Sequence, residues 1–573
     1  MFRIIRITIA ITIISLCCSS SAFAALVLKN EITGLKDPAL KNALTRLDLG
    51  QKSYKDTLTK KNILDLFDKG PNEIQEAIKP YGYFKATVNK TLAHQGNTWT
   101  AHYYVNAGPP LHITGLNVQV TGPGKQNKAF QKLLANFPIS QNDILNIDIY
   151  KKAKNSLLTV AQKQGYLRAA LTKDIIFVHT QNYTCTMQII LDTGPRFYFG
   201  PVNFSKTPLA NSFLRRYIPF KQGQPFSFDK ITDLQQTLSG GGYFSSVAVL
   251  PQQDKAVKQQ VPVNVGLTMR KNKEYKFGIG YGTASGIRGT FGFQWLWLNQ
   301  WGHKLNANFK LSMIEQNVAA QYIIPGKSPA HEYYTITGGV YNLNPDNGES
   351  FMKSIGVGYV RNYTSWQRVI VLDYQHETYK LTDISDYRNA RMLVPGINYS
   401  ITKADQVINT KKGNKFTIRF RGATTYALST TDFIQGELQD KLIYTIFDDN
   451  RFVLRGDLGY TITNDTNKLP LSKQFYAGGM QTIRGFKYDS IGPGRYLILG
   501  SAEYQRRIVG SFYAAIFYDT GNATNDFDLP FARSTGVGVV WQSPIGAVQV
   551  YIAKAISKKN KPLRLEFSLG PDL

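Results

Sequence analysis

The second half of the chain alternates apolar and polar residues with a period of two, and this pattern limits the folds open to it. In the run 416–421, apolar residues at even positions alternate with Arg419 and Arg421. The same alternation, with full charges on the polar face, recurs at 452–460 and 563–569. Strands with one apolar face and one charged face are typical of a membrane barrel with a wet lumen, because a soluble sandwich seldom buries arginine in its core.

Turn residues divide the chain beyond about Glu274 into about sixteen such segments, an even number as in bacterial barrels. Closing the sheet would remove edges that expose unpaired backbone to lipid. Aromatic residues gather near the expected strand ends, as at Trp295, Trp297 and Trp301, which suits an interfacial girdle. The pattern therefore predicts a transmembrane antiparallel β-barrel of about 16 strands over residues 273–573.

The N-terminus predicts export from the cytoplasm. A basic start, an apolar run over residues 7–18 and an Ala-Phe-Ala site at 22–24 are typical of a secretory signal peptide, here residues 1–24. Cys17 and Cys18 leave a lipoprotein alternative, although neither follows the small residue that a lipobox requires.

Three tandem repeats fill the first half. A Gly-Tyr pair followed by an apolar residue recurs at Gly82, Gly165 and Gly242, each time after a helical pattern and before a strand pattern. The element order is β-α-α-β-β, a small mixed sheet with two helices, and it resembles the polypeptide-transport-associated (POTRA) domain. Exposed sheet edges of this kind can pair with an extended client segment, and the sequence leaves the open edge undetermined. The expected domains are residues 25–108, 109–194 and 195–272.

Charge and motifs argue against two other classes of protein. The chain has 67 Lys+Arg and 39 Asp+Glu, a formal charge of +28, but the basic residues are spread without a dense block, so we expect no nucleic-acid partner. The seven histidines lack metal-ligand spacing, and Gly326-Lys327-Ser328 is not preceded by a phosphate-loop glycine. We therefore expect no enzyme activity, no cofactor and no metal. After signal removal, Cys185 is the one cysteine left and is expected to be buried.

One long glycine-rich loop, residues 475–495, interrupts the barrel pattern, and loops of this length are more often functional than not. It holds Ile483-Arg484-Gly485-Phe486 and resembles the (Val/Ile)-Arg-Gly-(Phe/Tyr) loop of the BamA/TamA superfamily of outer-membrane assembly factors. With the flanking residues 475–491 and matches at 500–505, 517–521 and 535–539, it is most similar to the TamA branch.

The resemblance implies a site. It places the loop in the barrel lumen with Arg484 against a carboxylate, for which we expect Asp519 first and Glu503 second, since a carboxylate facing lipid would be costly. Braced there, the loop is expected to lie opposite the seam between the first and last strands. The family implies that this seam opens sideways to template client strands. Its expected residues are Gly278, Gly280, Leu565 and Phe567.

The function implied is insertion and folding of β-barrel proteins such as autotransporters in the bacterial outer membrane, with the repeats in the periplasm. The partners implied are unfolded outer-membrane clients, the lipid bilayer and an inner-membrane-anchored, TamB-like protein docking on the first repeat. A two-partner secretion transporter, which usually has two such repeats, and phospholipid transport between membranes are the alternatives. A passive porin would need neither the repeats nor the loop.

Overall fold

The computed structural model describes residues 26–54, 58–179, 181–282, 286–382, 386–406, 409–526, 530–543 and 546–570. The expected signal peptide, residues 1–24, lies outside this range. Among the described residues, no helix is both long enough and apolar enough to cross a membrane.

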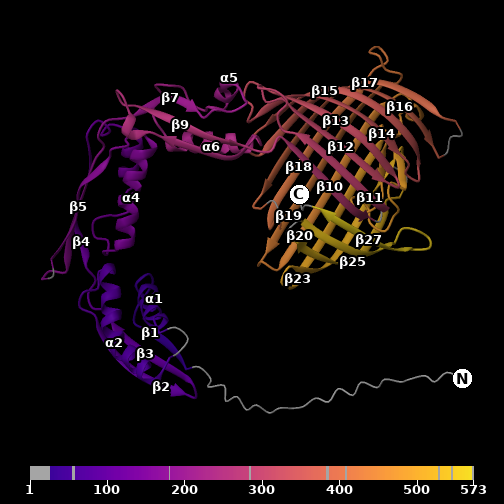
Figure 1. The fold of residues 1–573 in the computed structure, drawn as a ribbon. Coiled ribbons are helices and arrows are strands. Elements are labelled where there is room, and N and C mark those ends of the chain that lie inside the picture. The colour runs from indigo at the N-terminus through magenta and orange to yellow at the C-terminus, as the bar shows by residue number, and fades with distance from the viewer. Residues whose placement is uncertain are drawn as a thin grey trace, which may run out of the picture. The chain divides into compact units, whose positions relative to one another are not determined.

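Each repeat folds as predicted, with two helices beside a three-stranded mixed sheet (Figure 1). The sheet orders are β1-β3-β2, β4-β6-β5 and β7-β9-β8. In the first two, the strand that opens the repeat pairs parallel to the strand that closes it, so the closing strand is central. The elements are β1 (Val27–Thr33), α1 (Ala39–Lys52), α2 (Lys60–Ile78), β2 (Thr87–Gln95) and β3 (Thr98–Asn106); β4 (His112–Thr121), α3 (Lys128–Ala135), α4 (Ile147–Lys163), β5 (Ala170–His179) and β6 (Thr184–Asp192); β7 (Tyr198–Phe204), α5 (Asn211–Leu214), α6 (Phe228–Gly240), β8 (Phe244–Pro251) and β9 (Gln260–Met269).

Helix α4 shows how the sequence forms a repeat. The side chain of Asn146 accepts hydrogen bonds from the backbone N–H groups of residues 148 and 149, which satisfies donors at the start of the helix. Apolar residues at helical spacing, among them Ala153, Leu157 and Ala161, are buried. They pack on β6, where Cys185 is fully buried as expected, and burial raises the pKa of its thiol to about 11.

Within the described residues of the second half, sixteen antiparallel strands form one sheet, which confirms the predicted number. Every neighbour in the sheet is also the next strand in the chain, except that the long loop with its short strands β21 (Phe475–Ala477) and β22 (Ile491–Gly494) intervenes between β20 and β23. The sixteen are β10 (Lys273–Gly282), β11 (Gly286–Trp295), β12 (Lys304–Ser312), β13 (Glu315–Pro325), β14 (Glu332–Leu343), β15 (Gly348–Asn362), β16 (Trp366–Leu381), β17 (Arg388–Ala404), β18 (Lys412–Ala423), β19 (Phe433–Ile446), β20 (Asn450–Thr463), β23 (Tyr496–Val509), β24 (Phe512–Thr524), β25 (Ala532–Ser543), β26 (Gly546–Ala555) and β27 (Leu563–Gly570).

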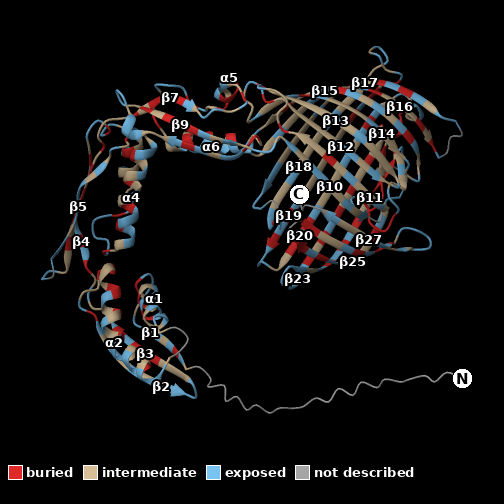
Figure 2. Cartoon of the chain, viewed as in Figure 1, coloured by how far each residue is buried: buried red, intermediate tan, exposed pale blue. Residues whose placement is uncertain are grey.

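Burial alternates along the barrel strands. On β20, Leu454 and Leu458 are exposed, whereas Arg451 and Val453, on the other face, are buried. The apolar face is therefore the outer face, and the charged face points inward, as the period-two pattern predicts. Figure 2 shows buried residues in red gathered around β20, β25 and β27.

The third repeat packs on the turns at one end of the barrel. The hydroxyl of Tyr243 donates to the carbonyl of Gly302 at 2.6 Å, and Lys304 Nζ donates to the carbonyl of Gly241 at 2.6 Å. Arg216 also donates to the carbonyl of Pro325 at 2.8 Å. These contacts join α6 and its neighbours to the turn between β11 and β12 and to the end of β13.

Candidate functional site in the barrel lumen

The long loop packs on the inner wall of the barrel. Four of its apolar side chains are buried in one cluster with residues of β23, β24 and β26. Within the loop, β21 pairs with β22, and the hydroxyl of Thr482 accepts from Gly478 N at 2.8 Å. These contacts give the loop a fixed shape independent of its charges. The four buried residues are Phe475, Ala477, Ile483 and Phe486.

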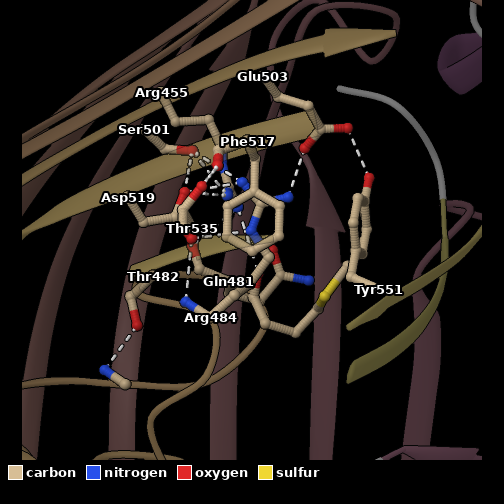
Figure 3. A network of polar contacts seen from close by, with 12 residues as sticks. Arg455, Gln481, Thr482, Arg484, Ser501, Glu503, Phe517, Asp519, Thr535 and Tyr551 are labelled. Carbon is tan, nitrogen blue, oxygen red and sulfur yellow. Dashed lines mark hydrogen bonds and ion pairs between the residues drawn. The ribbon is translucent and has the colours of Figure 1, made fainter. Parts of the chain in front are cut away.

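Arg484 is the centre of a buried polar network (Figure 3). Only 1% of it is exposed. Its Nε and NH2 donate to the two oxygens of Asp519 at 2.8 and 2.7 Å, and its backbone N donates to Oδ2 at 3.0 Å. NH1 forms an ion pair with Glu503. A planar guanidinium offers several donors in one fork, so it can hold both carboxylates at once.

Aromatic and polar groups complete the network. The guanidinium lies 3.5 Å from the ring centre of Phe517 and 4.8 Å from that of Tyr551. The hydroxyl of Tyr551 donates to Glu503 at 2.5 Å, and the hydroxyl of Ser501 donates to Asp519 at 2.6 Å. Each buried carboxylate therefore has several partners, the condition under which buried charges are stable.

A second arginine balances the charge. Arg455 NH2 donates to Ser501 at 3.0 Å and lies 3.8 Å from Asp519 Oδ1, and its NH1 donates to the loop carbonyl of Gln481 at 3.1 Å. Ion pairs with Asp519 and Glu503 offset the cost of burying the charge of Arg484. The loop thus carries a permanent positive charge into a balanced pocket of two arginines and two carboxylates.

The structure brings together all three charged residues expected from the sequence, Arg484, Asp519 and Glu503. Sequence reasoning missed Ser501, Arg455 and the two aromatic rings. Ser501 and Glu503 share one face of β23 by alternation, a signal that could have placed Ser501 in the network. Tyr551 lies 67 positions beyond Arg484 in the chain, and no local pattern points to it.

One expectation about the loop is wrong. It was expected to lie opposite the seam, but Gly485 N donates to Glu566 on the last strand, β27, at 3.3 Å. Gly485 has a φ of +83°, and a Cβ added there would lie 3.3 Å from the backbone of Ala553 and Ala555 on β26. Glycine is needed because it alone adopts this conformation readily and allows so close an approach. The loop therefore reaches the seam.

The seam residues are distributed over two strands that no ladder joins within the described residues, because β10 and β27 are the ends of the sheet. Gly278 and Gly280 pair with Thr290 and Arg288 of β11. On β27, Leu565 is exposed on the outer face and Phe567 is half-buried. On the outer face of β10, Phe277 is 81% exposed and Ile279 is 93% exposed.

A cavity of about 560 Å³ lies between the loop and the barrel wall. Its lining is mainly polar and includes residues of β18, β19, β20 and β27, among them Lys415, Asp457 and Ser568. In the part of the chain that the structure describes, no group of three or more His, Cys, Asp or Glu side chains is arranged to hold a metal ion.

Comparisons with known proteins agree with this architecture. Residues 301–572 match the Omp85 superfamily domain, residues 29–107 match POTRA domain TamA domain 1, and residues 197–269 match the POTRA model described as a surface antigen variable number repeat. The outer membrane protein assembly factor BamA of Neorickettsia risticii is 20% identical over 480 residues, which cover 75% of this chain and 62% of that protein. BamA of Buchnera aphidicola is 23% identical over 159 residues, 27% of this chain and 26% of that protein. The chain thus spans less than two thirds of the length of these relatives.

Among solved structures, BamA from Haemophilus ducreyi lacking POTRA domains 1–3 aligns with a TM-score of 0.67 at 17% identity, covering 80% of this chain and 98% of that chain. CdiB from Acinetobacter baumannii aligns with a TM-score of 0.48 at 12% identity, covering 80% of this chain and 90% of that chain. At these identities the likeness concerns the fold. The residues that match the Omp85 superfamily domain thus cover most of the barrel, and the residues that match the POTRA models precede them.

Proposed function

We propose that this protein helps to insert and fold β-barrel proteins, autotransporters among them, in the bacterial outer membrane. The barrel would lie in that membrane and the POTRA domains in the periplasm. The observation that carries the proposal is the seam: β10 and β27 end the sheet without a ladder between them in the described chain. A free strand edge inside a bilayer is a template for another strand, because its backbone donors and acceptors need partners.

The partner proposed for the first repeat is an inner-membrane-anchored, TamB-like protein. Support comes from the match of residues 29–107 to POTRA domain TamA domain 1. The helices of this repeat also expose Leu49 and Leu64, apolar side chains that a docking protein could cover. Photo-crosslinkers at these two positions in cells should capture a long periplasmic protein with a membrane anchor. If products from both sites lack such a protein, the partner assignment is wrong.

Locking the seam tests the main proposal. Cysteines at Gly278 and Ser568 would both lie on inner faces of the barrel, and buried Cys185 would not compete for them. A Cβ at position 278 would lie 2.5 Å from Thr290 Oγ1, so Thr290→Ala is added to every variant. Oxidation should reduce the insertion of an autotransporter barrel into liposomes to the uncatalysed rate, and reduction of the disulfide should restore it.

The matched control places cysteines at Thr417 and Gln439, which already pair across β18 and β19. This disulfide joins strands within the wall and should leave insertion unchanged. Full insertion with a quantitatively locked seam would refute lateral templating. A porin or a transporter that passes clients through the lumen would show that result.

A further inference from the structure

The Arg484 loop has a second buried contact, and this one holds an edge of the sheet. Glu566 of β27 accepts a hydrogen bond from Gly485 N at 3.3 Å and is 1% exposed. We propose that Glu566 is a positioning residue that ties the last strand to the seated loop, so that release of β27 at the seam requires this tie to break.

The position of Glu566 on its strand supports this role. Leu563, Leu565 and Leu569 occupy the outer face of β27, so Glu566 points inward beneath the loop. A buried carboxylate is costly unless it is hydrogen-bonded or paired. The Gly485 N–H supplies one partner, and Arg564 Nε, two residues away on the same strand, lies 3.5 Å from the carboxylate.

The backbone of the loop is shaped to reach β27. At Gly485 it crosses β26 so closely that a Cβ would meet the backbone of Ala553 and Ala555 at 3.3 Å. This approach aims the N–H across β26 at the neighbouring strand. A side chain at 485 would be strained at this φ of +83°, and its Cβ would press on the backbone of β26.

The tie is continuous with the Arg484 network. Tyr551 of β26 is the ladder neighbour of Glu566, and its hydroxyl donates to Glu503, which pairs with Arg484. Adjacent residues of one motif therefore hold different strands: Arg484 holds β23 and β24, and Gly485 holds β27. A seated loop restrains the final strand, whose other edge carries no ladder in the described chain.

Hydrogen exchange of the full-length protein in nanodiscs tests this tie strand by strand. In Glu566→Ala, the amides of β27 should exchange roughly tenfold faster or more, as expected for loss of a hydrogen bond to a charged group. The amides of β23 and β24 should keep their protection, because Arg484 still seats the loop. Glu566→Gln should remain near wild type, since an amide oxygen can still accept from Gly485 N.

One further variant separates a tie from simple charge burial, and a variant at another site is the control. Glu566→Asp keeps the charge near Arg564 but shortens the reach, so β27 should exchange faster than in Glu566→Gln. If the alanine variant does not fold, the comparison of Glu566→Asp with Glu566→Gln provides the test. Glu437→Ala is the matched control, because Glu437 of β19 pairs with Arg419 of β18 and not with β27, and the exchange of the β27 amides should be unchanged in it.

The proposal is overturned if β27 exchanges at the wild-type rate in folded Glu566→Ala, or if the glutamine variant exchanges as fast as the aspartate variant. Equal loss of protection in β23, β24 and β27 would also overturn it, because that result indicates a general structural defect. The measurement involves no client, so its outcome is independent of the proposed insertion function.

Discussion

Arg484 uses two different surfaces of its guanidinium. The edge donates to Asp519 and Glu503, and the face lies over the ring of Phe517. An ammonium group could supply the charge but neither the fork nor the flat face. The residue therefore serves as a rigid joint between the loop and the wall.

Replacing Arg484 should destabilise the barrel strongly. Arg484→Ala leaves two buried carboxylates without their main partner, which costs about 3–5 kcal/mol. Arg484→Lys should recover only part of this loss. The measurement is the urea midpoint of barrel unfolding, followed by tryptophan fluorescence. Arg419→Ala is the control, because the Arg419 side chain is 44% exposed where it pairs with Glu437, in contrast to 1% for Arg484, and its loss should cost less than about 1 kcal/mol. Equal midpoint shifts in the two alanine variants would contradict this account.

Strand β5 and helix α4 are joined by one carboxylate. Asp174 of β5 accepts from Lys154 Nζ at 2.5 Å and also from the hydroxyl of Tyr150. Partial burial disfavours the charged form of Asp174, but the hydrogen bonds from Lys154 and Tyr150 outweigh it and lower the pKa below 3.8. The negative form of Asp174 therefore stabilises the second repeat.

This contact predicts a pH dependence. Because folding lowers the pKa of Asp174, its charged form stabilises the folded protein at any pH above 3.8, the ordinary pKa of an aspartate. This stabilisation is lost as the pH falls through the lower pKa of the folded state. Calorimetry of the full chain should show a lower melting temperature for Asp174→Asn than for wild type at pH 7, and the difference should vanish at strongly acidic pH. Asp229→Asn, in an exposed pair with Lys163, should show little difference at either pH. A difference that persists in acid for Asp174→Asn would require another cause.

Helices and strands were easier to predict from the sequence than the side chains that meet in the site. The helical spacing of Ala153, Leu157 and Ala161 is local, and the structure forms α4 over Ile147–Lys163. The cost of a carboxylate that faces lipid likewise predicted an inward direction for Asp519 and Glu503. It could not say which inward residues meet, because that depends on strand register and on where the loop settles. Tyr551 and Glu566 were missed for this reason.

At the scale of the molecule, the third repeat and the barrel share hydrogen bonds to backbone carbonyls. Tyr243 and Lys304 each donate to a glycine carbonyl in the opposite part, and Lys304 Nζ also lies 4.3 Å from the ring centre of Tyr243. The reciprocal arrangement resists sliding as well as separation. We expect the third repeat to behave as a continuation of the barrel.

Limited proteolysis of the full chain checks this expectation. Wild type should resist cleavage between the third repeat and β10, near residues 270–273. Tyr243→Phe combined with Lys304→Met removes both donors and leaves two carbonyls without them, which costs about 1–3 kcal/mol for each, so cleavage there should become faster. Tyr275→Phe, which changes an exposed ring on β10, is the control. Equal cleavage of all three proteins would show that the contacts do not hold the junction.

The strand order of the barrel also determines how this protein itself can be assembled. Each ladder joins strands adjacent in the chain, with the loop as the one interruption. Hairpins can therefore form one after another from short-range contacts, which favours rapid pairing. Closure is the exception, since β10 and β27 stand at opposite ends of the barrel sequence and bringing them together carries the largest loop entropy. Ring closure is thus expected to be the last and slowest step in the biogenesis of the barrel, and a protein that closes late has already been, for a time, an open sheet in a membrane.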